Sequence, residues 1–192
     1  MRKKKRMKML LVWCLILTVL AAVLFFVRKK TSVWEKESSA PDLLNDLTVT
    51  DIESFEIVKS EGDTLSFSLD DGKWQLDASD GEHLSSDQID QTKAGAAAAS
   101  LTGVRLVQTL EHPGALSEYG LEEPSYTVTV RKKSGESIRM AVGNTNDMTG
   151  DVYLYLDDDP SRIYAVSSSV LASLQYGKAD YAAPEGSGTG GA

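Results

Sequence analysis

Two acidic runs come closest to a metal-binding pattern in this sequence. One consists of Asn144, Thr145, Asn146 and Asp147 with Asp151, and the other of Asp157, Asp158, Asp159 and Pro160. Carboxylate and amide oxygens are the ligands that Ca²⁺ prefers, but the first run lacks the glycine at the sixth and the glutamate at the twelfth position of the helix-loop-helix calcium loop. Because Asn, Asp and Pro also suit tight turns, we interpret both runs as hairpin turns and expect no metal ligands.

Catalytic side chains are equally sparse. His83 and His112 lie in expected turns far apart in the sequence, and neither has a partner at metal-ligand spacing. The chain contains no Cys-x-x-Cys, His-x-x-x-His or Gly-x-Ser-x-Gly motif. The three serines at 167–169 fit a helix N-cap, and the glycine-rich residues 186–191 lack the strand and helix that flank a phosphate-binding loop. We therefore predict no catalytic or cofactor-binding residue, no cofactor and no enzymatic activity.

The first thirty residues predict a membrane anchor. A basic cluster over residues 2–8 precedes the uncharged run from Met9 to Val27, and three more cations follow at residues 28–30. At about 1.5 Å per residue this run makes a helix of roughly 28 Å, close to the ~30 Å hydrocarbon core of a bilayer. We expect Met9 to Val27 to contact the lipid bilayer as a transmembrane helix.

This run is best interpreted as an uncleaved signal anchor. A cleaved signal peptide has a shorter apolar region of about 7–15 residues that ends at small residues, whereas here Phe25, Phe26 and Val27 lead directly into cations. A lipoprotein needs a cysteine just after the apolar region, and Cys14 lies inside it. The larger basic cluster precedes the helix, which predicts a single-pass protein of the bacterial cell membrane with a cytoplasmic N-terminus and an extracytoplasmic C-terminal domain.

The rest of the chain is acidic. Nine of the 20 Lys and Arg residues lie in the first 30 positions, and none of the 28 Asp and Glu residues does. Residues 31–192 therefore hold 11 basic and 28 acidic residues, a formal charge of −17. Such a domain is repelled by anionic surfaces, and it has no basic stripe interleaved with aromatic residues. We therefore exclude nucleic acid as a partner.

The composition divides the chain into five parts. Residues 1–8 are the cytoplasmic basic segment, 9–27 the transmembrane signal anchor and 28–47 a polar spacer. Residues 48–180 form the extracytoplasmic domain, and 181–192, rich in Gly, Ser and Ala, form a disordered tail. The domain is long enough for one ordinary hydrophobic core.

Alternating apolar residues predict antiparallel strands in this domain. In the first part, residues 55–57 and 64–69 alternate, and the turn at 70–72 leads into Trp74 and Leu76. Alternation on both sides of an Asp-Gly turn is a strong hairpin signal. Trp74 lies on the same strand face as Leu76, which favours a core position for the indole.

A helix follows the first strands. It is expected from about Asp87 to Leu101, with Ser85 and Ser86 as N-caps and an alanine-rich face that packs closely against a sheet.

The second part repeats the strand-turn-strand pattern. Strands are expected at 104–110, 126–130, 138–142, 152–156 and 163–166, with a short helix at 115–119 and a closing one at 167–174. Gly120 is expected in a left-handed conformation with Leu121 tucked beneath it. The two β-rich units look loosely alike, which does not establish a repeat. The fold class is therefore α+β, an antiparallel β-rich domain with one main helix between two β units and short helices, preceded by the transmembrane helix.

Several short motifs resemble the domain-of-unknown-function family numbered 4340. They are Asp71-Gly72-Lys73-Trp74-Gln75-Leu76 before a helix, Tyr119-Gly120-Leu121-Glu122-Glu123-Pro124 before a strand, and Val142-Gly143 followed by Gly150-Asp151-Val152-Tyr153. The resemblance spans roughly residues 50–176 and implies a bacterial protein with an N-terminal membrane helix and an extracytoplasmic α+β region. Some members are similar to auxiliary components of ABC transporters, including those linked to gliding motility. It implies no chemistry for any residue.

Three functions stay open at this point. The first is a non-enzymatic, membrane-tethered domain that binds or scaffolds a membrane or envelope protein, with Tyr153 and Tyr155 as candidates for an exposed apolar patch. The second is a sensor or small-ligand binder with a pocket between the two β units. The third is a hydrolase that uses two carboxylates with separated pKa values. The anchor, the scarcity of catalytic groups and the family resemblance favour the first.

Overall fold

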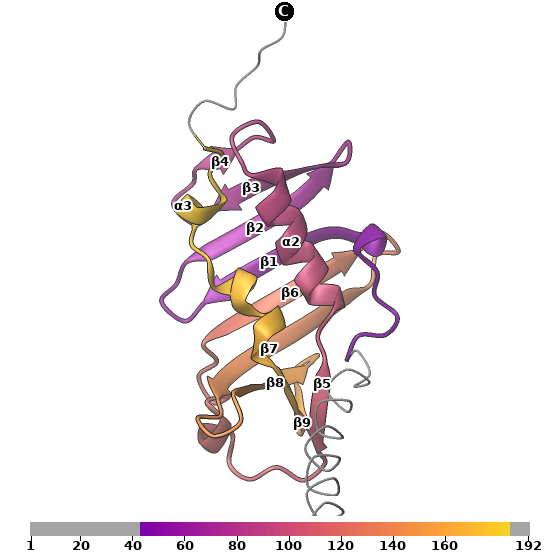
Figure 1. Cartoon of the computed structure of the whole chain (residues 1–192), viewed down its shortest axis with the longest axis vertical. Coiled ribbons are helices and arrows are strands. Elements are labelled where there is room, and N and C mark those ends of the chain that lie inside the picture. The colour runs from indigo at the N-terminus through magenta and orange to yellow at the C-terminus, as the bar shows by residue number, and fades with distance from the viewer. Residues whose placement is uncertain (1–42, 185–192) are drawn as a thin grey trace, which may run out of the picture. The chain divides into compact units, whose positions relative to one another are not determined.

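The computed structural model describes residues 43–184 (Figure 1). The basic segment 1–8, the expected transmembrane segment from Met9 to Val27, the spacer up to residue 42 and the tail from residue 185 lie outside the described residues. Within residues 43–184, no helix is long and apolar enough to cross a membrane.

Within the described residues nine strands form one sheet, and every pairing in it is antiparallel. The strand order is β4-β3-β2-β1-β6-β7-β8-β9-β5. The strands are β1 (Ile52–Lys59), β2 (Thr64–Asp70), β3 (Lys73–Ala78), β4 (His83–Leu84), β5 (Leu106–Leu110), β6 (Tyr126–Lys132), β7 (Ser137–Thr145), β8 (Asp151–Leu156) and β9 (Asp159–Ser167). The predicted antiparallel, β-rich α+β class is confirmed for this part of the chain.

Helical segments cover one face of the sheet (Figure 1). They include η1 (Val49–Asp51), α2 (Gln91–Thr102), η3 (Ser168–Val170), η4 (Ala172–Gln175) and α3 (Lys178–Tyr181), whereas η2 (Leu116–Tyr119) lies on the other face. The buried side chains of α2 are Ala94, Ala97, Ala98 and Leu101, each 0 % exposed. Small side chains allow the helix backbone to approach the strands closely, as the alanine-rich sequence predicts.

The main core lies between this sheet face and the helical segments. Phe55 stacks on Phe67 with ring centroids 4.5 Å apart, and the Trp74 ring meets Phe55 edge-on at 5.2 Å. Trp74 is only 6 % exposed. The core position predicted for this tryptophan is confirmed.

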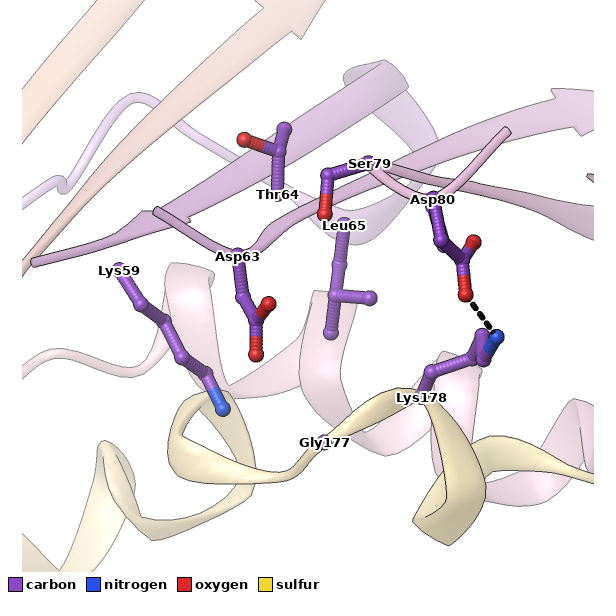
Figure 2. Close-up of a pocket in the computed structure, with 9 residues that line it drawn as sticks. Lys59, Asp63, Thr64, Leu65, Ser79, Asp80, Gly177 and Lys178 are labelled. Atoms are coloured by element: carbon purple, nitrogen blue, oxygen red, sulfur yellow. Dashed lines mark hydrogen bonds and ion pairs between the residues drawn. The ribbon is translucent and has the colours of Figure 1, made fainter. Parts of the chain in front are cut away.

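The C-terminal strap, residues 168–184, runs from β9 back across the helical side to the first strands (Figure 1). Its Tyr181 side chain is fully buried, meets Phe67 edge-on at 4.8 Å and donates a hydrogen bond to the Ser173 carbonyl at 2.7 Å. Lys178 of the strap pairs with Asp80 beyond the end of β3 (Figure 2). The ordered domain therefore extends beyond residue 180, where the tail was expected to begin, because Tyr181 belongs to the core.

The N-terminal boundary also differs from the expected one. Leu44 and Leu47 are buried in the main core, and the Leu43 N–H donates to the Val104 carbonyl at 2.6 Å. Packing thus begins before residue 48, inside the segment that was predicted to be a polar spacer. Because polar residues surround Leu44 and Leu47 in the sequence, the segment was interpreted as a spacer.

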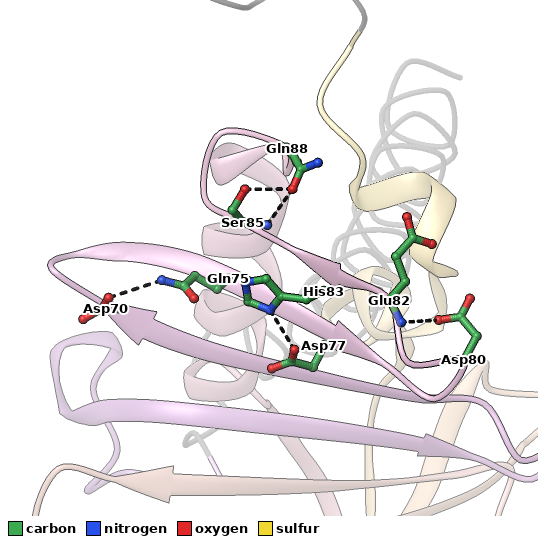
Figure 3. Close-up of polar contacts among 8 residues, drawn as sticks. All are labelled: Asp70, Gln75, Asp77, Asp80, Glu82, His83, Ser85 and Gln88. Atoms are coloured by element: carbon green, nitrogen blue, oxygen red, sulfur yellow. Dashed lines mark hydrogen bonds and ion pairs between the residues drawn. The ribbon is translucent and has the colours of Figure 1, made fainter.

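The N-terminus of α2 lies later than the sequence suggested. Asp90 caps the helix, and its side chain accepts hydrogen bonds from the Thr92 and Lys93 N–H groups. Ser85, an expected N-cap together with Ser86, instead donates to Gln88 at 2.7 Å in the preceding turn (Figure 3). Ile89 forms an extended bridge with Ala182 of the strap, so the chain cannot become helical before residue 90.

The two β units begin with equivalent hairpins. Strands β1–β4 and β6–β9 form two meanders that meet where β1 pairs with β6, for example at Ile57 and Val128. Their first turns match residue by residue: Gly62 and Gly135 have φ angles of 93° and 91°. In both turns a lysine N–H donates to an acidic residue's carbonyl at 2.8 Å, Lys59 to Asp63 and Lys132 to Glu136. The similarity that the sequence left open is therefore a repeated hairpin.

Candidate functional site

The first acidic run spans the end of β7, the loop after it and the first residue of β8. The Asn146 side-chain oxygen accepts from the Met148 and Thr149 N–H groups at 2.9 and 3.3 Å, and its amide donates to the Tyr153 hydroxyl at 2.7 Å. Its side chain therefore organises the loop, as a turn interpretation requires.

The second acidic run forms the tight turn between β8 and β9. Asp157 and Asp158 have positive φ angles of 52° and 57°. The Asp157 carboxylate accepts from the Arg139 N–H at 3.0 Å, and Asp158 forms an ion pair with the Arg139 guanidinium at 2.6 Å. Hydrogen bonds from Ser161 hold the pKa of Asp159 below its ordinary value. Over residues 43–184 no group of three or more His, Cys, Asp or Glu side chains is arranged to hold a metal ion.

The two histidines belong to opposite edges of the sheet. His83 lies on β4, where its Nδ1 is 2.7 Å from the Asp77 carboxylate. His112 follows β5, the strand at the other edge, and lines an open pocket of about 560 Å³ with Pro113 and Asp159. The sheet order thus keeps the two imidazoles from sharing a site. Of the three serines, Ser167 occupies the N-cap position of η3, but its hydroxyl contacts Ser169 rather than the helix backbone.

The corner formed by residues 115–121 packs onto β7. Gly120 is left-handed with φ 66° and Leu121 is 2 % exposed, which confirms both expectations for this motif. Tyr119 meets Tyr153 edge-on with centroids 5.0 Å apart. Tyr153 and Tyr155 are both partly buried, and Tyr153 is engaged by the corner, so the pair does not form the exposed patch that we considered.

The corner covers the second β unit, at β7 and β8, on the sheet face opposite α2. Leu121, Ala141, Ile163 and Ala165 are buried there but do not belong to the main core. Leu121 lies against Gly143, and Ala141 and Ala165 pair with Tyr155 and Tyr153 on β8. This half of the sheet therefore has apolar packing on both faces.

Over β1–β4 and the adjoining β6 the same side remains uncovered by other described residues. Successive residues of a strand point to opposite faces, and the residues that point away from the main core are all partly or fully exposed. We call them the open face: Ser54, Glu56 and Val58 of β1, Ser66 and Ser68 of β2, Gln75 and Asp77 of β3, His83 of β4, and Thr127, Thr129 and Arg131 of β6.

The open face is ordered in rows across the strands. One row runs from His83 through Asp77, Ser66 and Glu56 to Thr129, each the registered partner of the next. Ser66 donates to Glu56 at 3.1 Å. Figure 3 shows the contact between Asp77 and His83, and that between Gln75 and the nearby Asp70, which is 3.3 Å long. The row alternates acidic groups with hydroxyls on a rigid backbone.

A second feature is a pocket of about 160 Å³ beneath the strap. Figure 2 shows Lys59 and Asp63 on one side of Leu65, and Asp80 with Lys178 on the other. The Lys178 ammonium holds the pKa of Asp80 below its ordinary value, and Asp80 and Glu82 together raise the pKa of Lys178. These ion pairs fix the strap over the turn that follows β3.

Comparison with protein families gives one match. Residues 88–184, about half of the chain, match the family described as Domain of unknown function (DUF4340). The chain belongs to this family. The DUF4340 match covers α2, the corner, the second meander and the strap, while β1–β4 precede it. Comparison with curated proteins and with solved structures found no match.

Proposed function

We propose that this DUF4340 protein is a non-enzymatic, single-pass membrane protein whose extracytoplasmic domain binds a partner protein through the open face. The partner would be a membrane or envelope protein, for example a component of an ABC transporter. The observation that carries the proposal is the asymmetry of the sheet: the corner covers one half, and the equivalent side of the other half presents ordered polar rows.

The open face has the dimensions and chemistry of a protein interface. Strands lie about 4.8 Å apart, so the row from His83 on β4 to Thr129 on β6 spans roughly 19 Å. A standard interface buries about 800 Å² on each partner, so a partner would contact the open face and the turns that border it. Side chains held by cross-strand contacts lose little entropy on binding. The mixture of acids with His83 and Arg131 favours a specific partner over a uniformly charged one.

The carboxyl groups support a binding role over hydrolysis. Among residues 43–184, those with clear pKa shifts are Asp51, Asp80, Asp87 and Asp159, and all four are lowered, mainly by hydrogen bonds from Thr48, Lys178, Ser85 and Ser161. A pair of catalytic carboxylates needs one member with a raised pKa that can act as the acid. The boundary between the two β units, where a ligand pocket was considered, is occupied by the β1–β6 ladder.

Crosslinking and affinity purification of the full chain from its native membranes tests the proposal. The test variant carries Ser66→Arg and Thr129→Arg, which place two bulky cations on the open face. The control variant carries Ser134→Arg in the exposed turn between β6 and β7. We expect a partner that is recovered with the original chain and with the control but lost with the double variant.

Two results would count against this function. One is recovery of the same partner at the same yield with the double variant. The other is a chain that is recovered alone from membranes under every crosslinking condition.

A further inference from the structure

In the pocket beneath the strap, the Asp63 carboxylate lacks the lysine partner that the equivalent residue has in the second β unit. In the equivalent turn of the second half, the Lys132 ammonium pairs with Glu136 at 3.3 Å. In the first half, the Lys59 ammonium instead donates to the Gln175 and Tyr176 carbonyls of the strap, at 3.0 Å each. The strap thus removes from Asp63 the cation that its counterpart Glu136 retains.

Asp63 is consequently left without a hydrogen-bond or ion-pair partner for its carboxylate within the described residues. Its side chain nevertheless lines the pocket, and Figure 2 shows it beside Lys59. An ammonium has three protons, and Lys59 uses two of them on the strap carbonyls. The pocket therefore offers one unpaired anion and one remaining cationic donor at the same end.

The opposite end and the floor complete the pocket. Lys178 lies at the opposite end, where its ammonium pairs with Asp80 and Glu82 and has one N–H left without an acceptor among the described residues. Leu65 and Ala78 give an apolar floor between the two ends. The volume of about 160 Å³ lies well below the ~300–1,000 Å³ of pockets for drug-sized ligands. An occupant must be small.

We propose that this pocket binds a small zwitterion of the size of glycine or alanine. The ligand ammonium pairs with the Asp63 carboxylate, and the ligand carboxylate accepts the remaining proton of the neighbouring Lys59. A methyl side chain fits against Leu65 and Ala78. A singly charged ligand pairs with only one of the two groups, Asp63 or Lys59, so a zwitterion binds more tightly than either single charge.

Isothermal titration calorimetry on the full chain in lipid nanodiscs tests this site. Glycine and L-alanine are the probes, methylammonium and acetate are the single-charge controls, and L-tryptophan tests the size limit. We expect saturable binding of glycine and alanine only. Asp63→Asn should weaken it by at least about tenfold, because a charge-assisted hydrogen bond is lost. Glu136→Gln, the matched change in the equivalent turn, should leave it unchanged.

Several outcomes would overturn the proposal. They are the absence of saturable binding of glycine and alanine, equal affinity in the Asp63→Asn variant, equal binding of acetate or methylammonium alone, and tight binding of tryptophan. Thermal unfolding of both variants verifies that they fold, and Asp63→Ser provides a second removal of the carboxylate in the same exposed turn. If Asp63→Ser retained full affinity, the carboxylate would have no role.

Discussion

The Cα of Gly143 faces the carbonyl oxygen of Tyr119 so closely that a β-carbon on this glycine would lie 2.2 Å from that oxygen. Gly143 belongs to β7 and Tyr119 to the corner, two motifs that are separated in the sequence. Their contact closes the second half of the sheet, because it places Leu121 and Tyr119 over the strands.

Gly143→Ala should therefore destabilise the domain. A backbone carbonyl cannot move aside without displacing the corner, so we expect a loss of about 1–3 kcal/mol in the free energy of unfolding, as for other overpacked sites. Gly95→Ala is the control, since that glycine lies in helical backbone and an added β-carbon there meets nothing within 4 Å. Urea denaturation followed by circular dichroism measures both. Equal losses at the two positions would show that the corner contact is not tight.

Gly95→Ala should act in the opposite direction. Gly95 lies inside α2, and an added β-carbon would meet nothing within 4 Å. Alanine in a helix interior is favoured over glycine by roughly 0.5–1 kcal/mol. The midpoint of urea denaturation should rise by a corresponding amount, and a lowered midpoint would mean that α2 has less room than the structure indicates.

Two buried tyrosines should respond differently to the loss of their hydroxyl groups. The Tyr181 hydroxyl donates to the Ser173 carbonyl, so Tyr181→Phe should cost about 0.5–1.5 kcal/mol of stability. The Tyr126 hydroxyl is buried without a hydrogen-bond partner in the described part of the chain, although the Gln175 side chain is near it. Tyr126→Phe should be neutral or stabilising. Denaturation of the two variants side by side checks the order, and a larger loss for Tyr126→Phe would contradict it.

The same residues predict a loss of stability at high pH. Burial raises the pKa of Tyr126 from its ordinary value of 10.0 to about 12, and burial also raises the pKa of Tyr181. Above pH 10 the unfolded chain releases these protons while the folded chain retains them. The unfolded state then binds fewer protons, so the free energy of unfolding falls with rising pH by up to about 1.4 kcal/mol per unit for each tyrosine.

Denaturation midpoints measured from pH 8 to pH 12 check this dependence. Stability should be constant with respect to these tyrosines below pH 10 and fall above it. Tyr126→Phe should reduce the slope, because it removes one of the two buried phenols. An unchanged slope in Tyr126→Phe would exclude the buried phenol as a source of the effect.

The proposed topology can be measured by cysteine labelling. In a Cys14→Ser background, a cysteine at Met148 lies in the β7–β8 loop, where the native side chain is 94 % exposed. A membrane-impermeant maleimide should label it in intact spheroplasts. A cysteine at Lys5 should react only after lysis. The reverse pattern would contradict the proposed orientation, and a mature chain that begins after residue 27 would contradict the anchor.

Local features of the sequence were sufficient to predict most individual elements. The Asp71-Gly72 turn, the left-handed Gly120 and the alternation in β6 depend on backbone preferences within a few residues, and the structure has each of them. The burial of Trp74 and the alanine face of α2 also follow from strand and helix periodicity.

Long-range contacts decided the rest, because no local pattern encodes which distant segments meet. The start of α2 depends on the bridge between Ile89 and Ala182, and the end of the ordered domain depends on Tyr181 entering the core. The composition of the β strands alone did not reveal that one half of the sheet is covered and the other open. That difference arises because the corner folds onto Gly143.

The candidate sites show the same division. The sequence by itself determined that a lysine precedes an acidic residue by four positions at Lys59 and Asp63 and again at Lys132 and Glu136. Only the tertiary structure decided that Lys132 keeps its acid while Lys59 is drawn to the strap. The physical reason is that the strap brings two backbone carbonyls to Lys59, from residues 116 and 117 positions further along the chain. The Lys59 ammonium therefore donates to the strap carbonyls, and within residues 43–184 the Asp63 carboxylate has no partner.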